Sequence, residues 1–204
     1  MRTCVRSLGE LGEDLVFAPE RHVTLALAGD GVPLGDLVVE RRERVLPSEL
    51  ARAIVIDTTH ARDGVLDVAA ALRDRAEGKS QKKRALVGDL LVSRLRPYLR
   101  QIALVQTVPP RRVLALSTEF YVLAPKSDGD DLAFLLPFLL GDAAQRALAA
   151  AQEGGHHPRV PRASLFALRV PHALVRRRAR TSKAVAARLL AFYEAQEALA
   201  SVLR

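Results

Sequence analysis

Three arginines interrupt an apolar run, "GDLLVSRLRPYLRQIALV", that otherwise has the composition of paired β-strands. Because side chains alternate between the two faces of a strand, we expect Arg94 and Arg96 to extend the apolar face that begins at Leu90. A turn then brings Arg100 onto the returning strand, so that the three guanidinium groups converge on one rim. The planar guanidinium fork suits phosphate oxygens and the O6/N7 edge of guanine. These residue types at this spacing therefore indicate binding of a polyanion.

Other residues can join this rim. A basic run precedes the arginines, a tyrosine follows the turn proline, and "GGHHPRVPR" places two histidines and two arginines in a Gly-rich loop. The tyrosine can stack on a base or cover the core, and the histidines can enter a groove or lie idle at the surface. The candidate contact residues are Lys79, Lys82, Lys83, Arg84, Arg94, Arg96, Tyr98, Arg100, His156, His157, Arg159 and Arg162.

The net charge of +8 is concentrated in two blocks of the chain. Residues 79–112 hold nine Lys or Arg and one acid, Asp89, and residues 156–183 hold eight Lys or Arg and no acid. The rest of the chain is acidic. Most charge runs are simply solvated faces, but two nearly acid-free blocks on an acidic body favour a polyanionic partner.

A catalytic alternative rests on acids and a lysine. Asp63 or Asp67, together with Glu77 and Lys79, could hold Mg²⁺ and activate water as a metal-dependent nuclease does. The expected context is wrong for this chemistry, because Asp67 and Glu77 fall on a predicted helix that Gly78 ends. The sequence also lacks a P-loop, a dinucleotide-binding fingerprint and the Asn/Asp-Pro-Pro-Tyr/Phe motif of adenine methyltransferases.

Composition limits the other classes. Cys4 is the single cysteine and the five histidines show no metal-ligand spacing, so we expect no disulfide framework, no bound metal and a cytoplasmic location. The N-terminal residues contain no apolar signal region, and the longest apolar run, 132–140, is far shorter than the ~20 residues that span a bilayer. We therefore expect no membrane association.

The hydrophobic pattern predicts an α+β fold, a compact mixed or antiparallel sheet with flanking helices and a C-terminal coiled-coil-like helix. We expect strands in "HVTLALA", "AIVID", "RALVGDLLVS", "RQIALVQ", "RVLALSTEFYVLA" and "LFALRV". A short helix is expected in "GVLDVAAALRDRAEG", and a longer one after Asp131 that Pro137 kinks or splits. The lead "PHALVRRRAR" is expected to be loop-like, and one helix is expected to follow it.

Several of these segments, taken in order, resemble a known family. "GDLLVSRLRP", "STEFYVL", a helix, and the Gly-rich loop before "LFALRVP" are similar to the target recognition domain of specificity (S) subunits of type I restriction-modification systems. "VPLGDLVVE" is similar to the opening segment of that domain, so the resemblance covers about residues 32–171. Individually these motifs are weak; their order carries the resemblance.

The resemblance implies a function without catalysis or cofactor. A specificity subunit binds double-stranded DNA sequence-specifically and positions it for an adenine methyltransferase subunit and a restriction (translocase-nuclease) subunit. The alternatives are the metal-dependent nuclease and a nonspecific, basic nucleic-acid-binding or ribosome-associated protein. The segment "PHALVRRRARTSKAVAARLL" is rich in Arg and Ala and departs from the family's proline-rich lead into its spacer helix. This departure indicates that the spacer helix has a changed partner.

The chain has room for one recognition domain and one spacer helix, half the usual family complement. We expect a DNA-binding domain over residues 1–172 and a spacer or dimerisation helix over residues 173–204. Within 181–204, apolar residues and one glutamine recur at alternating steps of four and three, which is typical of a coiled-coil seam. The helix can therefore form a homodimer, pair with a methyltransferase, or pack on its own domain. The seam positions are Val185, Leu189, Phe192, Gln196, Leu199 and Leu203.

Overall fold

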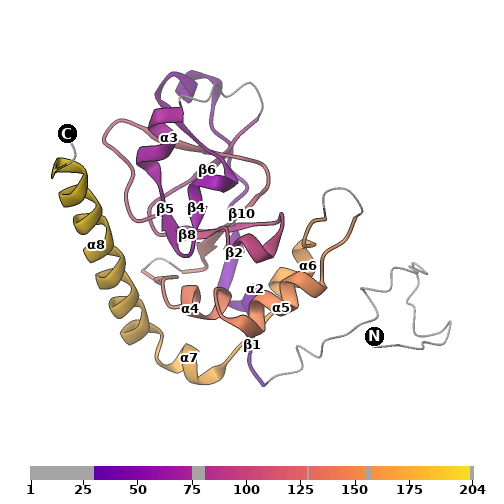
Figure 1. Cartoon of the computed structure of the whole chain (residues 1–204). Helices are drawn as coiled ribbons and strands as arrows, with labels where there is room; N and C mark the ends of the chain where they lie inside the picture. Colours follow the sequence, from indigo (N-terminus) through magenta and orange to yellow (C-terminus); the bar gives the residue numbers. More distant parts are fainter. Residues whose placement is uncertain (1–29, 75–80, 128, 155–157, 203–204) are drawn as a thin grey trace.

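The computed structural model describes residues 30–74, 81–127, 129–154 and 158–202. Within these ranges a four-stranded antiparallel sheet lies at the centre of the molecule, in the order β2-β10-β7-β8. Helices lie beyond one face of this sheet, and a smaller sheet with one helix lies beyond the other (Figure 1). The central strands are β2 (Val38–Glu40), β7 (Leu90–Ser93), β8 (Ile102–Leu104) and β10 (Phe120–Pro125).

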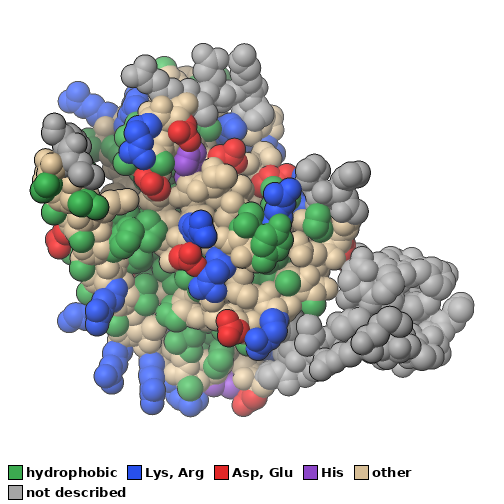
Figure 2. Space-filling view, viewed as in Figure 1, with side chains coloured by type: hydrophobic (Ala, Val, Ile, Leu, Met, Phe, Trp, Pro, Cys, Tyr) green, Lys and Arg blue, Asp and Glu red, His purple; other side chains and the backbone are tan. Residues whose placement is uncertain are grey.

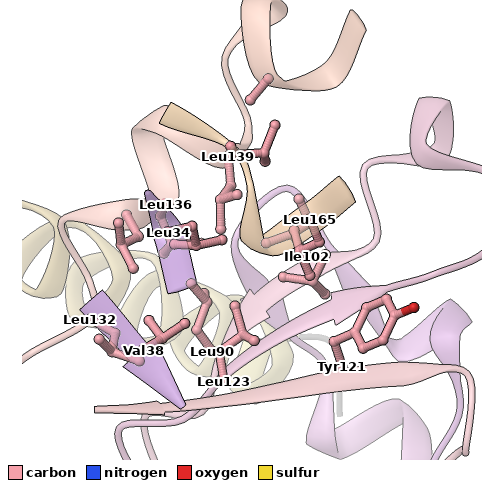
Figure 3. Close-up of a cluster of buried hydrophobic side chains, with 14 of the residues drawn as sticks. Leu34, Val38, Leu90, Ile102, Tyr121, Leu123, Leu132, Leu136, Leu139 and Leu165 are labelled. Carbon is pink, nitrogen blue, oxygen red and sulfur yellow. The ribbon is translucent and has the colours of Figure 1, made fainter. Parts of the chain in front are cut away.

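Side chains that alternate along the central strands pack into two separate hydrophobic cores. Leu90 and Leu123 belong to the core on the helical side, shown in Figure 3, whereas Leu91 and Val122 belong to the core on the other side. All four residues of β7 are buried for this reason. The predicted face with an apolar start and a cationic end is therefore wrong, because both faces of the sheet are covered and the strand ends before Arg94.

The second core is closed by a three-stranded sheet in the order β3-β9-β6, in which β3 and β9 are parallel and β6 and β9 antiparallel. A short ribbon and one helix complete this side. The predicted strand at 53–57 and the short helix are confirmed; Gly78 lies outside the described residues. The elements are β3 (Ala53–Ile56), β4 (Ala61–Arg62), β5 (Val65–Leu66), α3 (Val68–Asp74), β6 (Lys83–Ala85) and β9 (Val113–Leu116), with 3-10 turns at Pro47–Arg52, Thr58–His60 and Pro97–Leu99.

The first core is covered by short helices and by the C-terminal helix. The expected split near Pro137 is confirmed, but the break falls at Gly141, and Pro137 is accommodated within the first turn of α4. The elements are β1 (Val32–Pro33), α2 (Leu34–Leu37), α4 (Leu135–Leu139), α5 (Asp142–Ala150), α6 (Arg162–Phe166), β11 (Arg169–Val170), α7 (His172–Arg176) and α8 (Arg178–Val202).

Several local predictions were wrong. "RALVGDLLVS" and "RVLALSTEFYVLA" are not single strands, because each forms two strands that belong to different sheets. "LFALRV" is not one strand, because its first residues end α6 and only Arg169–Val170 pairs, with β1. "PHALVRRRAR" is not loop-like: Pro171 precedes α7, and the Ala, Leu and Arg that follow are strong helix formers. The expected strand at 22–28 lies outside the described residues. The predicted C-terminal helix is confirmed as α8.

A buried ion pair fixes the start of β7. Asp89, 1% exposed, accepts hydrogen bonds from Arg41 Nε at 2.7 Å and Nη2 at 3.1 Å, and from the Leu86 backbone N–H at 2.8 Å. Hydrogen bonding to Asp89 raises the pKa of Arg41 above its ordinary value. The single acid of the first basic block is therefore structural.

We expect Asp89→Asn to lower the free energy of unfolding by about 3 kcal/mol, because it removes the buried counter-charge of the Arg41 guanidinium. Urea titration followed by circular dichroism would measure this. As a control, Glu43→Gln removes an exposed partner of the same arginine and should cost less than about 1 kcal/mol. Equal effects of the two variants would contradict the structural role of Asp89.

Candidate nucleic-acid interface

Charged side chains gather where the central strands end. Arg94 directly follows β7, and Glu119 directly precedes the antiparallel neighbour β10. The Arg94 backbone N–H donates to the Glu119 carbonyl at 2.9 Å, so the two residues are held side by side. Once the chain leaves the doubly covered sheet, polar side chains can reach solvent.

The Glu119 carboxylate binds two arginines. Arg159 donates to it through Nε at 3.1 and 3.3 Å and through Nη2 at 2.7 Å. Arg94 Nε lies 3.7 Å from the same carboxylate, and this nitrogen is buried without a hydrogen-bond partner. Glu119 thus holds one guanidinium through a fork and attracts a second by charge alone.

Backbone contacts bring Arg159 to this position. Arg159 exchanges two backbone hydrogen bonds with Glu153, at 2.8 and 2.9 Å, across the Gly-rich loop. The Val160 N–H donates to the Arg94 carbonyl at 2.8 Å, and the buried Tyr121 hydroxyl donates to the Val160 carbonyl at 2.7 Å. Arg159 and Val160 are therefore held at the end of β7, although Arg159 lies 65 positions after Arg94 in the sequence.

A second carboxylate, Glu40 at the end of β2, binds three more cations. Arg162 Nε donates to it at 2.8 Å, Lys83 Nζ lies 3.6 Å from it, and Arg42 Nε lies 3.8 Å from it. Lys83 also donates to the Phe120 carbonyl at 2.6 Å. An open pocket of about 300 Å³ lies beside Glu40, lined also by Arg42, Arg44, Lys83 and Thr118.

Tyr121 joins the two carboxylate groups into one unit. Its ring lies 5.7 Å from the Arg94 guanidinium and 5.8 Å from Lys83 Nζ, within the range of cation–π attraction. We call the whole set the ion-pair cluster, which consists of Glu40, Arg42, Lys83, Arg94, Glu119, Arg159 and Arg162.

The environment shifts the pKa values of these groups in opposite directions. Hydrogen bonds from Arg159 lower the pKa of Glu119 below its ordinary value, and the same contact raises the pKa of Arg159. Burial lowers the pKa of Lys83 and raises that of Tyr121. The cluster contains five basic and two acidic side chains, which corresponds to a formal excess of three positive charges.

The structure brings four of the twelve predicted contact residues together: Lys83, Arg94, Arg159 and Arg162. The convergence of the three arginines of the opening motif on one rim is wrong. Arg100, beyond the turn, donates to Asp63 at 2.5 Å and to the Leu140 carbonyl at 2.8 Å, away from Glu119. Its backbone is in the left-handed region, so it ends the turn instead of beginning the strand.

The remaining predicted residues have other surroundings. Arg84 pairs with Glu49, and the Lys82 carbonyl accepts a hydrogen bond from Val45. Arg96 and Tyr98 are exposed on the turn after β7, where they can still meet a ligand. Lys79, His156 and His157 lie outside the described residues.

Sequence reasoning missed the two carboxylates that organise the cluster. Glu40 closes a β-branched, apolar run and is followed by "RRER", and Glu119 lies inside the predicted strand "RVLALSTEFYVLA", which the structure divides into β9 and β10. A polar residue at the boundary of a buried strand is the available signal. The spacing of the sequence, however, does not reveal that each carboxylate binds cations from two distant segments.

The described residues of the nuclease alternative, Asp63 and Asp67, have other partners. The Asp67 carboxylate accepts from the Ala70 N–H at 2.7 Å and caps α3, and Asp63 pairs with Arg100. Glu77 and Lys79 lie outside the described residues. Across the part of the chain that the structure describes, no group of three or more His, Cys, Asp or Glu is arranged to hold a metal ion.

Five basic residues at the C-terminal end of the second basic block lie outside the ion-pair cluster. The exposed basic residues along α7 and the start of α8 are Arg176, Arg177, Arg178, Arg180 and Lys183, and Lys and Arg side chains project from this region in Figure 2.

Among the described helices, none has the length and apolarity needed to cross a membrane.

Comparison with solved structures shows that this chain shares its fold with part of a known chain. No protein-family model matches the sequence, and no curated protein matches it significantly. One similar solved chain comes from work on complex assembly and conformational transition of the type I R-M system; it has 20% identity, a TM-score of 0.52, and covers 85% of this chain and 45% of that chain. Another is the HsdS subunit from Thermoanaerobacter tengcongensis, with 19% identity, a TM-score of 0.49, and 84% and 43% covered. This chain thus spans less than half the length of either.

The lowered pKa of Glu119 predicts a pH-dependent contribution to stability. A carboxyl whose pKa is lower in the folded state stabilises the fold above its unfolded pKa, about 4.3, and loses this contribution as the pH falls through the folded value. Glu119→Gln should therefore be less stable than wild type at neutral pH, and the difference should shrink below about pH 4. Urea titrations across this range would measure it; a difference independent of pH would contradict the ion pair.

Proposed function

We propose that this chain is the DNA-specificity module of a type I-like restriction-modification system and has no catalytic activity of its own. The ion-pair cluster is the observation that supports this most strongly. It places guanidinium groups at the solvent edge of a fold similar to that of a chain from a type I R-M system. Residues 1–172 would bind double-stranded DNA, and residues 173–204 would contact the rest of the assembly.

The cluster has the charge and the access that a duplex requires. The side chains of Arg94, Arg159 and Arg162 are 37%, 40% and 47% exposed, so their charged ends can reach phosphates or base edges. Affinity would come from cations on phosphates, and specificity from the few guanidinium, amide or hydroxyl groups that reach a base edge. The exposed Arg96 and Tyr98 would extend this surface.

The C-terminal helix suits a protein partner. One side of the helix packs on its own domain. Leu189 is buried, and the Tyr193 hydroxyl accepts a hydrogen bond from the Leu66 N–H at 3.0 Å. Phe192 and Leu199, two of the predicted seam positions, are 47% and 61% exposed. They are separated by seven residues and so share one stripe of the helix. We propose that this stripe pairs two copies of the chain or binds the methyltransferase subunit. A second copy would bring a second recognition domain, which would read the other half of a split DNA target.

Substitution of cluster arginines tests DNA binding. If Arg94 and Arg162 contact phosphates, changing either to Ala should weaken binding to all duplexes and make the slope of log K against log salt shallower by about 0.9. If one reads guanine, the loss should be ~1 to 3 kcal/mol and confined to duplexes with that base. Fluorescence anisotropy with selected and random-sequence duplexes would measure both.

Arg188→Ala on α8 is the matched control, since it removes one exposed arginine away from the cluster. Wild-type affinity in both cluster variants, with unchanged circular dichroism, would contradict DNA binding by this surface. Equal wild-type affinity for selected and random duplexes would instead indicate a nonspecific nucleic-acid-binding protein.

The helix stripe is tested with Phe192→Asp combined with Leu199→Asp. Because both side chains are exposed, the double variant should retain its thermal unfolding temperature while losing self-association in light scattering of the full chain. Leu190→Asp is the control: Leu190 is also exposed but lies on the opposite side of the helix from Leu199. A wild-type monomer at high concentration would contradict the homodimer and leave the methyltransferase contact as the use of the stripe.

A further inference from the structure

The cluster cations are already neutralised in part by the protein itself. Each of the five lies within 4 Å of a carboxylate, three at Glu40 and two at Glu119. Glu40 is largely buried and Glu119 is about one quarter exposed, so solvent screens these pairs less than ordinary surface pairs. A phosphate that approaches the cluster must therefore compete with a fixed internal anion.

Both carboxylates also have a positioning effect. Five cations on neighbouring segments repel one another, and Tyr121 accepts only two of them at its ring. Glu119 holds Arg159 through a bidentate fork that fixes the plane of the guanidinium, and Glu40 holds Arg162 through one hydrogen bond from Nε. The cluster is thus kept in one geometry before any ligand arrives.

From these two effects we infer that Glu119 and Glu40 are specificity-determining residues, which suppress binding to arbitrary duplexes while holding the arginines in the geometry that the correct sequence fits. The inference rests on the proposed DNA-binding function. A random duplex offers phosphates alone and must displace the carboxylates to use the cations fully. A matching duplex gains additional contacts with bases from cations that are already oriented. These contacts offset the free-energy cost of displacing the carboxylates.

The inference fits the unequal contacts of Arg94 and Arg159. Arg159 occupies the hydrogen-bonding positions of Glu119, whereas Arg94 is held by charge, by the Tyr121 ring and by its backbone, and its buried Nε lacks a partner. Arg94 is therefore held less firmly than Arg159. Removing the Glu119 charge would release Arg159 to phosphates and leave Arg94 less precisely placed.

The test is Glu119→Gln, which keeps the side-chain size and removes the charge. On a random-sequence duplex we expect tighter binding, by roughly three- to tenfold at low salt, and a salt slope steeper by about 0.9 to 1.8 as one or two arginines engage phosphates. On a duplex selected from a random library with the wild-type protein, we expect a smaller gain or a loss. The ratio of the two affinities should therefore fall.

Glu197→Gln is the matched control, because it changes the net charge equally at an exposed position on α8. It should alter both affinities little and leave their ratio unchanged. Glu40→Gln should behave as Glu119→Gln does, with Arg162 and Lys83 released in place of Arg159.

Two results would overturn the inference. Weaker binding of Glu119→Gln to all duplexes by the same factor would make the carboxylate a scaffold only, and a loss confined to the selected duplex would make it a base contact. Failure to enrich any sequence with the wild-type protein would count against the proposed function instead. In that case the random-duplex measurement still decides whether Glu119 restrains the arginines.

Discussion

Burial of the central sheet on both faces is the constraint on which the rest of the structure depends. Because β7, β8 and β10 contribute to two cores, their side chains are apolar on both faces except for Ser93, the last residue of β7. Charged side chains are excluded until a strand ends. Arg94, Glu119 and Glu40 stand at such ends, and the exception inside the body, Asp89, is matched by Arg41. The location of the candidate interface is thus a consequence of how the sheet is covered.

Carboxylates make the concentration of cations at this edge physically possible. Like charges on adjacent segments raise the free energy of the folded state unless counter-charges lie between them. Glu119 and Glu40 supply these charges, and they also attach Arg159 and α6, through Arg162, to the sheet. The same ion pairs therefore serve the stability of the fold and set how strongly its cations act on a ligand.

The C-terminal helix combines two roles on different sides. Ser182, Leu189 and Tyr193 anchor it to the body; the Ser182 hydroxyl accepts a hydrogen bond from the Phe134 N–H at 3.1 Å. The predicted coiled-coil seam is thereby divided, since Leu189 belongs to the core whereas Leu199 is exposed. A helix anchored in this way would present its exposed stripe at a fixed position relative to the DNA-binding surface, as the proposed assembly requires.

The sequence by itself determined the α+β class, the C-terminal helix, the split of the helix near Pro137 and the segments that carry the cations. These follow from local periodicity, proline geometry and charge, which each segment carries on its own. Only the tertiary structure decided which cations meet. Arg94 and Arg159 converge because antiparallel pairing and a loop contact join distant segments, while Arg100, six residues from Arg94, turns toward Asp63. The local pattern could not show that both faces of the sheet are buried. Because of this burial, Arg94 lies beyond the end of the strand and not on one of its faces.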